Sequence, residues 1–75
     1  KEMDRDLLAR IRAREVNPIR GWRIMKGIDQ KELCRRTGIR QSNLSRMEQL
    51  GAVHNIRTLE RIAKALDIDP KELLP

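Results

Sequence analysis

The chain has 75 residues, enough for one small domain, and its single cysteine and single histidine exclude an internal disulfide and a complete zinc site. Its 17 Lys and Arg residues against 11 Asp and Glu residues give a net charge of +6, and Trp22 is the only aromatic residue. A basic chain with so few aromatic rings attracts nucleic acid but cannot stack unpaired bases, so the composition favours duplex DNA over single strands and over RNA.

The first predicted helix covers about residues 4–14 and carries Leu7, Leu8 and Ile11 on one side, with arginines around the rest. A helix this short is marginal on its own in water, because helix nucleation is unfavourable and only a longer stretch offsets it. We therefore expect the helix to dock, either on the body of its own domain or on a partner chain.

A second helix is predicted to begin with Asn17 as its N-cap and Pro18 in its first position, and to end at Gly27. An Asn side chain accepts a hydrogen bond from the first turn, and Pro loses only an N–H that has no helical partner. The residues expected to face inward are Ile19, Trp22 and either Ile24 or Met25.

Two short helices are predicted next, over residues 30–37 and 41–49, with residues 38–40 between them. Gly38 accepts the left-handed backbone that a tight turn requires, and the small Cys34 lets the second helix cross closely over the first. The residues expected to lock the two helices together are Leu33, Ile39, Leu44 and Met47. Two short helices joined by so tight a turn are typical of a helix–turn–helix.

The end of the chain predicts a fifth helix after Asn55 and a short turn that opens with Asp69 and Pro70. The apolar residues of the fifth helix follow the helical period: Ile56, Leu59, Ile62, Ala63 and Leu66. Since no stretch alternates as a strand would, the predicted fold is a compact all-α domain. The short amphipathic end is expected to leave apolar area for a second copy to cover. The predicted dimer face consists of Leu66, Ile68, Leu73 and Leu74.

The positive charge is concentrated in one part of the chain. Residues 33–47 carry four arginines and no acid, whereas residues 48–75 have a net charge of −1. A solvated helix face normally places acidic partners four residues from its bases, and this stretch contains none. The stretch is therefore predicted to face phosphate, with Arg35, Arg36 and Arg40 in contact with it.

The outward face of the helix over residues 41–49 is polar in a particular way. Its side chains are Gln41, Ser42, Asn43, Ser45 and Arg46. These are the types that form hydrogen bonds with base edges in the major groove, and the face lacks the alternating Lys and Glu of an ordinary surface helix. The composition of this face therefore favours reading of duplex DNA.

Residues 17–74 resemble the lambda-repressor-like, Xre/Cro family of helix–turn–helix DNA-binding domains. The resemblance rests on Gln30 and Gln41, which begin the two helices of the motif, on Gly38 between them, and on the closing segment I-A-K-A-L-D-I-D-P-K-E-L-L. It implies five compact helices, a homodimer that binds a palindromic operator in duplex DNA, and repression of transcription.

The resemblance also implies roles for single residues. Gln30 would contact a phosphate and brace Gln41, and an ion pair between Arg23 and Glu48 would tie the recognition helix to the core. Base edges would be faced by Gln41, Ser42 and Arg46, while Arg40 and Asn43 would hold the backbone, with Asn43 also placed to reach a base. The next loop lacks the family's usual Lys and Arg, which leaves His54, Asn55 and Arg57 as the phosphate candidates there.

The N-terminal part has a narrower resemblance, to antitoxin repressors that pair with RelE/ParE-type toxins. It rests on a leading helix followed by Glu15, Asn17-Pro18 and Trp22-Arg23, with Val16 inserted into the usual Glu-Asn-Pro junction. Under this hypothesis the leading helix contacts a cognate toxin or a second copy through Leu7, Leu8 and Ile11. The alternative is a helix that packs only on its own core.

We therefore predict an N-terminal helical extension over residues 1–16 and a helix–turn–helix domain over residues 17–75. The expected function is that of a sequence-specific transcriptional repressor in the cytoplasm, and of the antitoxin of an operon that represses its own promoter. No enzymatic site, cofactor or metal site is expected, since the sequence holds no nucleophile with a base, no carboxylate pair and no phosphate-binding glycine loop. The alternative function is a protein-interaction module that keeps the fold without specific DNA binding.

Overall fold

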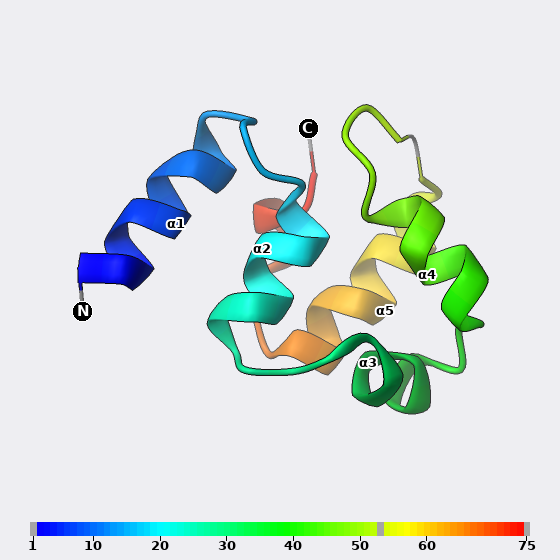
Figure 1. The fold of residues 1–75 in the computed structure, drawn as a ribbon. Helices are drawn as coiled ribbons and strands as arrows, with labels where there is room; N and C mark the ends of the chain where they lie inside the picture. The colour runs from blue at the N-terminus through cyan, green and yellow to red at the C-terminus, as the bar shows by residue number, and fades with distance from the viewer. Residues whose placement is uncertain (1, 53, 75) are drawn as a thin grey trace.

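The computed structural model describes residues 2–52 and 54–74, and within them it contains helices, turns and loops but no strand (Figure 1). The helices are α1 (Glu2–Arg12), α2 (Pro18–Met25), α3 (Gln30–Thr37), α4 (Gln41–Met47) and α5 (Ile56–Leu66), followed by the 3₁₀ turn η1 (Pro70–Glu72). The predicted all-α fold is confirmed.

Two helices end two residues earlier than predicted. The helix α1 stops at Arg12 because the chain turns back toward α2 through Arg14, which has a left-handed backbone with φ of 64°. The helix α4 stops at Met47, and the carbonyls of Met47 and Gln49 accept hydrogen bonds from the Asn17 side chain instead of continuing the helical pattern.

The core lies where α2, α3, α4, α5 and η1 meet, with α5 central in the arrangement (Figure 1). Its buried residues are Ile19, Leu33, Leu44, Leu59, Ile62, Ala63, Leu66 and Leu73. The helical period predicted the members on α2, α3, α4 and α5 correctly, but it also predicted Ile56, which is 62% exposed, and it did not place Leu73 in the core. Ile56 stands in the first turn of α5, and it is neither in the core cluster nor among the residues packed against it. Of the two alternatives on α2, Ile24 is exposed and Met25 is half-buried.

The predicted dimer face is corrected by the burial of its members. Leu66 and Leu73 are 1% and 5% exposed because they pack in the core of the single chain, and Ile68 and Leu74 are half-buried against the same core. The C-terminal end therefore covers its own apolar area, and the reason for placing a second copy on these four residues does not hold.

The leading helix α1 forms a hairpin with α2 at the edge of the molecule (Figure 1). Ile11 is 2% exposed and packs over Gly21, where an added Cβ would lie less than 3.0 Å from the Ile11 side chain. Gly21 weakens the helix in which it stands, but it permits this close approach. The end of the hairpin is tied to the C-terminal turn, since Arg12 pairs with Glu72 at 3.3 Å. The helix therefore docks on its own domain through Ile11, while Leu7 and Leu8 remain half-buried.

Candidate nucleic-acid interface

The turn between α3 and α4 is built by local hydrogen bonds. Gly38 takes the left-handed backbone expected of it, with φ of 77°, and its N–H donates to the carbonyl of Cys34 at 2.8 Å. The hydroxyl of Thr37 donates to the carbonyl of Leu33 and accepts from the N–H of Ile39. These bonds hold α3 and α4 at a steep angle to each other, with α4 at the edge of the molecule opposite α1 (Figure 1).

The outward side of α4 is the polar face that the sequence predicts. Its five side chains, Gln41, Ser42, Asn43, Ser45 and Arg46, are all exposed, whereas Leu44 on the opposite side is completely buried. Arg46 donates to the side-chain oxygen of Asn43 at 3.5 Å, so these two residues lie side by side one turn apart. The helix can therefore present both donors and acceptors to a base edge.

Gln30, at the start of α3, connects this face to the interior. Its Nε2 donates to Glu48 Oε1 at 3.2 Å, and its Oε1 accepts from Ser45 Oγ at 3.1 Å and from Gln41 Nε2 at 3.4 Å. A carboxylate can only accept hydrogen bonds, so Glu48 determines which end of the Gln30 amide faces inward. The Gln30 oxygen then faces Gln41 and engages one of its two amide hydrogens.

The ion pair between Arg23 and Glu48 lies beneath this network. Arg23 donates Nε to Glu48 Oε2 at 2.7 Å and Nη2 to Glu48 Oε1 at 2.9 Å, and both side chains are largely buried. The hydrogen bond with Glu48 raises the pKa of Arg23 above its ordinary value, and burial opposes that shift only in part. The pair connects α2 to the end of α4 and fixes the direction in which α4 leaves the core.

Asn17 makes a second connection to the end of α4, which its role as a helix cap does not reveal. Its side-chain oxygen accepts from the N–H of Arg20 at 3.1 Å, as an N-cap should. Its amide nitrogen donates to the carbonyls of Met47 and Gln49, each at 3.0 Å. Sequence reasoning found the cap from the residue type, but the second contact depends on where α4 ends in space.

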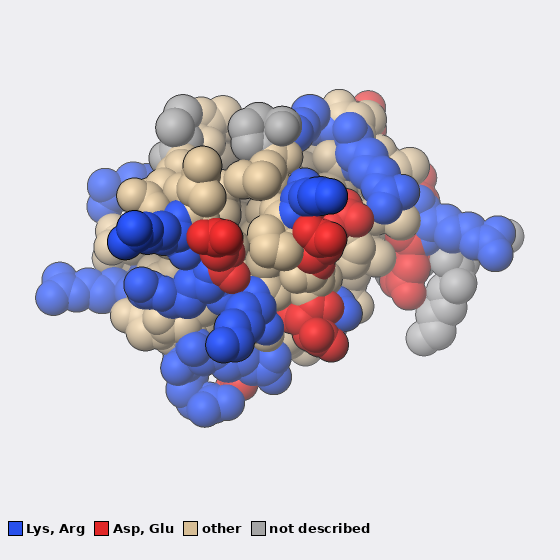
Figure 2. All heavy atoms as spheres, turned by 180° about the vertical axis from the view of Figure 1, so that it is seen from behind, with Lys and Arg blue, Asp and Glu red and all other residues tan. Residues whose placement is uncertain are grey.

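The arginines at the end of α3 have an acidic partner that the sequence analysis did not count. Glu32, one turn earlier, accepts from Arg35 at 2.6 Å and from Arg36 at 2.7 Å, and these hydrogen bonds lower the pKa of Glu32 to about 2. Arg36 also donates to the carbonyl of Ala65 at the end of α5, at 3.1 Å. The expectation of an unpaired basic stretch is therefore wrong at these two positions, because the partner lies just outside residues 33–47. Figure 2 shows acidic side chains among the basic ones on one face of the molecule.

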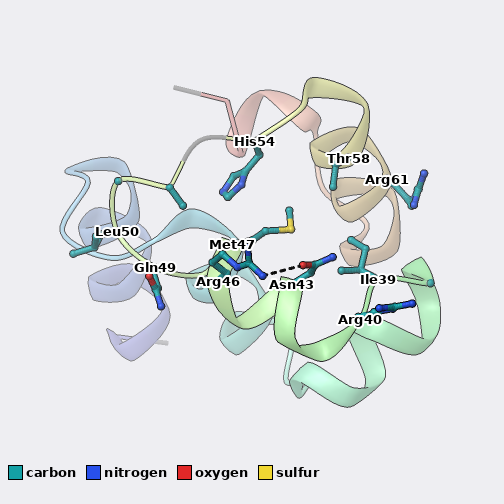
Figure 3. Close-up of a pocket in the computed structure, with 13 residues that line it drawn as sticks. Ile39, Arg40, Asn43, Arg46, Met47, Gln49, Leu50, His54, Thr58 and Arg61 are labelled. Carbon is teal, nitrogen blue, oxygen red and sulfur yellow. Dashed lines mark hydrogen bonds between the residues drawn. The ribbon is translucent and has the colours of Figure 1, made fainter.

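Arg40 and Arg46 differ from that pair, because neither makes an ion pair with any of the residues that the structure describes. Both line a groove of about 890 Å³ between α4, the loop after it and α5 (Figure 3). Its apolar lining residues include Ile39 and Met47, and its other polar lining residues include Asn43, Gln49, His54, Thr58 and Arg61. The lining of the groove thus combines three arginines and a histidine with apolar side chains.

Arg61 is the residue of this groove that sequence reasoning missed. It stands on α5, twenty-one residues beyond Arg40, and its side chain donates weakly to the carbonyl of Thr37 at 3.5 Å. Only the packing of α5 against α3 brings it beside the turn of the motif. Arg57, which the sequence analysis did name, is exposed in the first turn of α5, and its N–H is capped by the side chain of Asn55.

The helix α4 crosses α3 through a glycine turn, and its polar face is directed outward beside a basic groove. This arrangement defines a helix–turn–helix DNA-binding domain. The chain belongs to the family of Cro/C1-type HTH DNA-binding domains, which matches residues 19–75, and it is accordingly a DNA-binding regulator of transcription. No curated protein and no solved structure gives a significant match. Over the residues described, the structure has no helix long and apolar enough to cross a membrane.

Proposed function

We propose that the chain is a repressor that binds a palindromic site in duplex DNA as a homodimer, with α4 in the major groove. The base-reading residues are Gln41, Ser42, Asn43 and Arg46, and their shared exposure on one side of α4 supports this assignment. The core holds α4 at both ends, through Glu48 at its C-terminal end and through the turn at its start. A helix held in this way can place its side chains against base edges in one register.

The observation that carries the proposal is the direction of hydrogen bonding from Glu48 through Gln30 to Gln41. One amide hydrogen of Gln41 is engaged by Gln30, which leaves one hydrogen and the amide oxygen for a base. Adenine offers an acceptor at N7 and a donor at N6, so it matches this pair. Guanine offers two acceptors on the same edge and would need both hydrogens. Gln41 is therefore assigned to an adenine.

Phosphates on the two sides of the major groove would meet different parts of the domain. Gln30 lies at the start of α3 on one side, and the groove beside α4 lies on the other, with Arg40 and Arg61 in its lining. Arg57 is exposed near the same end of α5. Arg35 and Arg36 are expected to contribute less to phosphate binding than their charge indicates, because Glu32 already neutralises part of that charge.

Selection of bound sites from random duplex DNA tests the proposal. The expected product is a palindrome with half-sites about 34 Å apart and an adenine that loses its enrichment in the Gln41→Ala variant. Ser42→Ala serves as the control, since it should change a different position. A gel-shift titration of the selected site at two salt concentrations then separates specific binding from general attraction to phosphate. A protein-interaction module without DNA specificity would give no enriched sequence and no specific complex.

The structure also bears on a second function, that of an antitoxin. The helix α1 lies outside the matched residues 19–75, and Leu7 and Leu8 on it are only half-buried. We propose that these two residues contact a cognate toxin, while Ile11 serves the hairpin with α2 and is not available to a partner. Co-expression with the product of a neighbouring gene tests this. Failure to co-purify with that product, or co-purification unchanged in the Leu7→Asp variant, contradicts it.

A further inference from the structure

A second groove, distinct from the basic groove beside α4, has a volume of about 400 Å³. Its walls come from the junction between α1 and α2, from the described part of the loop after α4, from α5 and from the C-terminal end. The junction and the loop lie along the same edge of the molecule (Figure 1). The apolar residues that line the groove are Val16, Pro18, Ile19, Leu50, Ala52, Leu59 and Leu73. A largely apolar groove of this volume has the size of a small-molecule site.

The polar residues that line this groove give it positive charge and no negative charge. Arg14 is exposed and His54 is half-buried, and none of the described residues in the lining is acidic. Asn17 is buried, and both hydrogens of its amide are engaged by the carbonyls of Met47 and Gln49. Asn17 therefore has no hydrogen left to donate to a ligand. A molecule in the groove would meet apolar side chains and the N–H donors of Arg14 and His54.

The Arg14 side chain is held at the groove by the fold. Its backbone is left-handed, with φ of 64°, where the chain turns from α1 toward α2. Its Nη2 donates to the carbonyl of Leu74 at 3.1 Å, beside Leu73 in the lining. A guanidinium carries five N–H donors, so one bond to a carbonyl leaves enough of them to bind a carboxylate. The groove thus combines an apolar lining with a positive charge in a defined position.

We propose that this groove binds a small monocarboxylate with a hydrocarbon body. The body lies against the apolar lining and the carboxylate binds Arg14, with the ring of His54 as a further N–H donor. A cationic ligand would be repelled by Arg14 and by a chain of net charge +6. An anion without an apolar body would instead be drawn to the three arginines of the groove beside α4. The charge and the apolar lining therefore select the same class of molecule.

The N-terminal extension builds one wall of this site. Arg14 and residues 16–18 all line the groove, and all of them precede residues 19–75, which match the family. The ligand site therefore goes beyond the proposed repressor function and depends on a part of the chain outside the matched region. It also differs from the proposed toxin contact, because neither Leu7 nor Leu8 is in the lining.

The site adjoins the proposed DNA-binding surface, because residues 50–52 and His54 line both grooves. A bound monocarboxylate lowers the net charge of +6 by one unit and adds this negative charge beside a surface that is proposed to meet phosphates. We therefore expect the ligand to weaken DNA binding. This consequence rests on the proposed function, whereas the ligand site itself does not.

Isothermal titration calorimetry of the 75-residue chain with octanoate tests the site in the absence of DNA. We expect saturable binding of one octanoate per chain. Acetate lacks the hydrocarbon body and octan-1-ol lacks the charge, so each should bind at least about tenfold more weakly than octanoate. The inference is overturned if octanoate shows no saturable binding, or if octan-1-ol binds as tightly as octanoate.

Variants of the lining locate the bound octanoate. Arg14→Asn should weaken binding at least about tenfold, because Asn tolerates a left-handed backbone but carries no charge, and Arg14→Lys should retain most of the affinity. Ala52→Trp should also weaken binding, since it fills the groove without touching the charge. The matched control is Arg10→Gln, an exposed arginine of α1 outside the lining, and equal weakening by this variant would contradict the site. Circular dichroism verifies that each variant remains helical.

A gel-shift titration of the selected DNA site tests the consequence for DNA binding. Saturating octanoate should weaken the complex about fivefold or more relative to acetate at the same ionic strength, and Arg14→Asn should remove this difference. An equal affinity for DNA in octanoate and in acetate would refute the coupling. Saturable octanoate binding by a chain that prefers no DNA sequence would support the ligand site and remove the proposed function.

Discussion

The two helices of the motif carry similar numbers of arginines but use them differently. On α3, Arg35 and Arg36 are held by Glu32 one turn earlier, and Arg36 also binds a carbonyl at the end of α5. On α4 and at its start, Arg46 and Arg40 have no carboxylate within reach among residues 2–52 and 54–74. The net charge of a segment therefore does not show which arginines are free to bind phosphate. What decides this is the position of the nearest carboxylate in the folded chain.

The largest expected effect is a loss of folding stability, and it distinguishes the buried ion pair beneath α4 from the exposed ion pair on α3. Arg23→Ala leaves Glu48 buried without its partner and should lower the free energy of unfolding by about 3–5 kcal/mol in urea titrations. Arg35→Ala should lower the free energy of unfolding far less, since its pair with Glu32 is exposed to solvent. The double variant Arg23→Met with Glu48→Leu should recover most of the loss. Equal costs for the two single variants would contradict the distinction.

Within the DNA complex, Arg46→Ala should have the next largest effect. Loss of a side chain that reaches a base edge costs about 1–3 kcal/mol on the selected site and relaxes the preference at one position. Fluorescence anisotropy on the selected site and on single-base variants measures both quantities. Uniform weakening on every sequence would instead place Arg46 on a phosphate.

The contrast between Arg40 and Arg35 can be tested through salt. Removal of one phosphate contact flattens the dependence of log K on log salt concentration by about one unit. We expect this change for Arg40→Ala and a smaller one for Arg35→Ala, because Glu32 holds Arg35 in the folded chain. The titration is the same for both variants, so each serves as the control for the other. Equal flattening would show that Arg35 leaves Glu32 for a phosphate when DNA binds.

The smallest expected effect is the pH dependence of the stability that Glu32 contributes through its ion pairs with Arg35 and Arg36 on α3. The pKa of Glu32 is lowered to about 2 by its hydrogen bonds with Arg35 and Arg36, so its charged form favours the folded state. That contribution is fully present above the unfolded pKa of about 4.3 and is lost as the pH falls toward 2. The urea midpoint of Glu32→Gln should therefore lie below that of the unsubstituted chain at neutral pH. The two should converge near pH 2, and a constant difference across this range would exclude the carboxylate as its source.

Much of the fold could be predicted because its signals are local. Helix caps, proline at the first helical position and apolar periodicity depend on residues within one or two turns, and they located each helix to within about two residues. The same is true of Gly38, whose left-handed backbone follows from the length of the turn. The polar face of α4 was also predictable, because a helix with one buried side must expose the other.

The features that sequence reasoning missed are contacts between distant parts of the chain. Arg61 joins Arg40 in one groove only because α5 packs on α3, and no local pattern marks it. From the sequence alone, Gly21 only weakens α2. In the structure it allows the close approach of Ile11. The burial of Leu73 likewise depends on how η1 folds back on α5. Glu32 is different, because it lies within one helical turn of Arg35 and Arg36 and only one residue before the basic stretch over residues 33–47.

The side chain of Asn17 has a consequence for the substitutions that this position can accept. It accepts one hydrogen bond and donates two, to carbonyls more than twenty-five residues away along the chain. Asp would supply the acceptor but neither donor, and Ser or Thr would supply at most one donor without the reach of an amide. Gln has the right groups but is longer by one methylene. In a complete mutational scan, position 17 should therefore be among the least tolerant sites, although it lies outside both the apolar core and the proposed DNA-reading face.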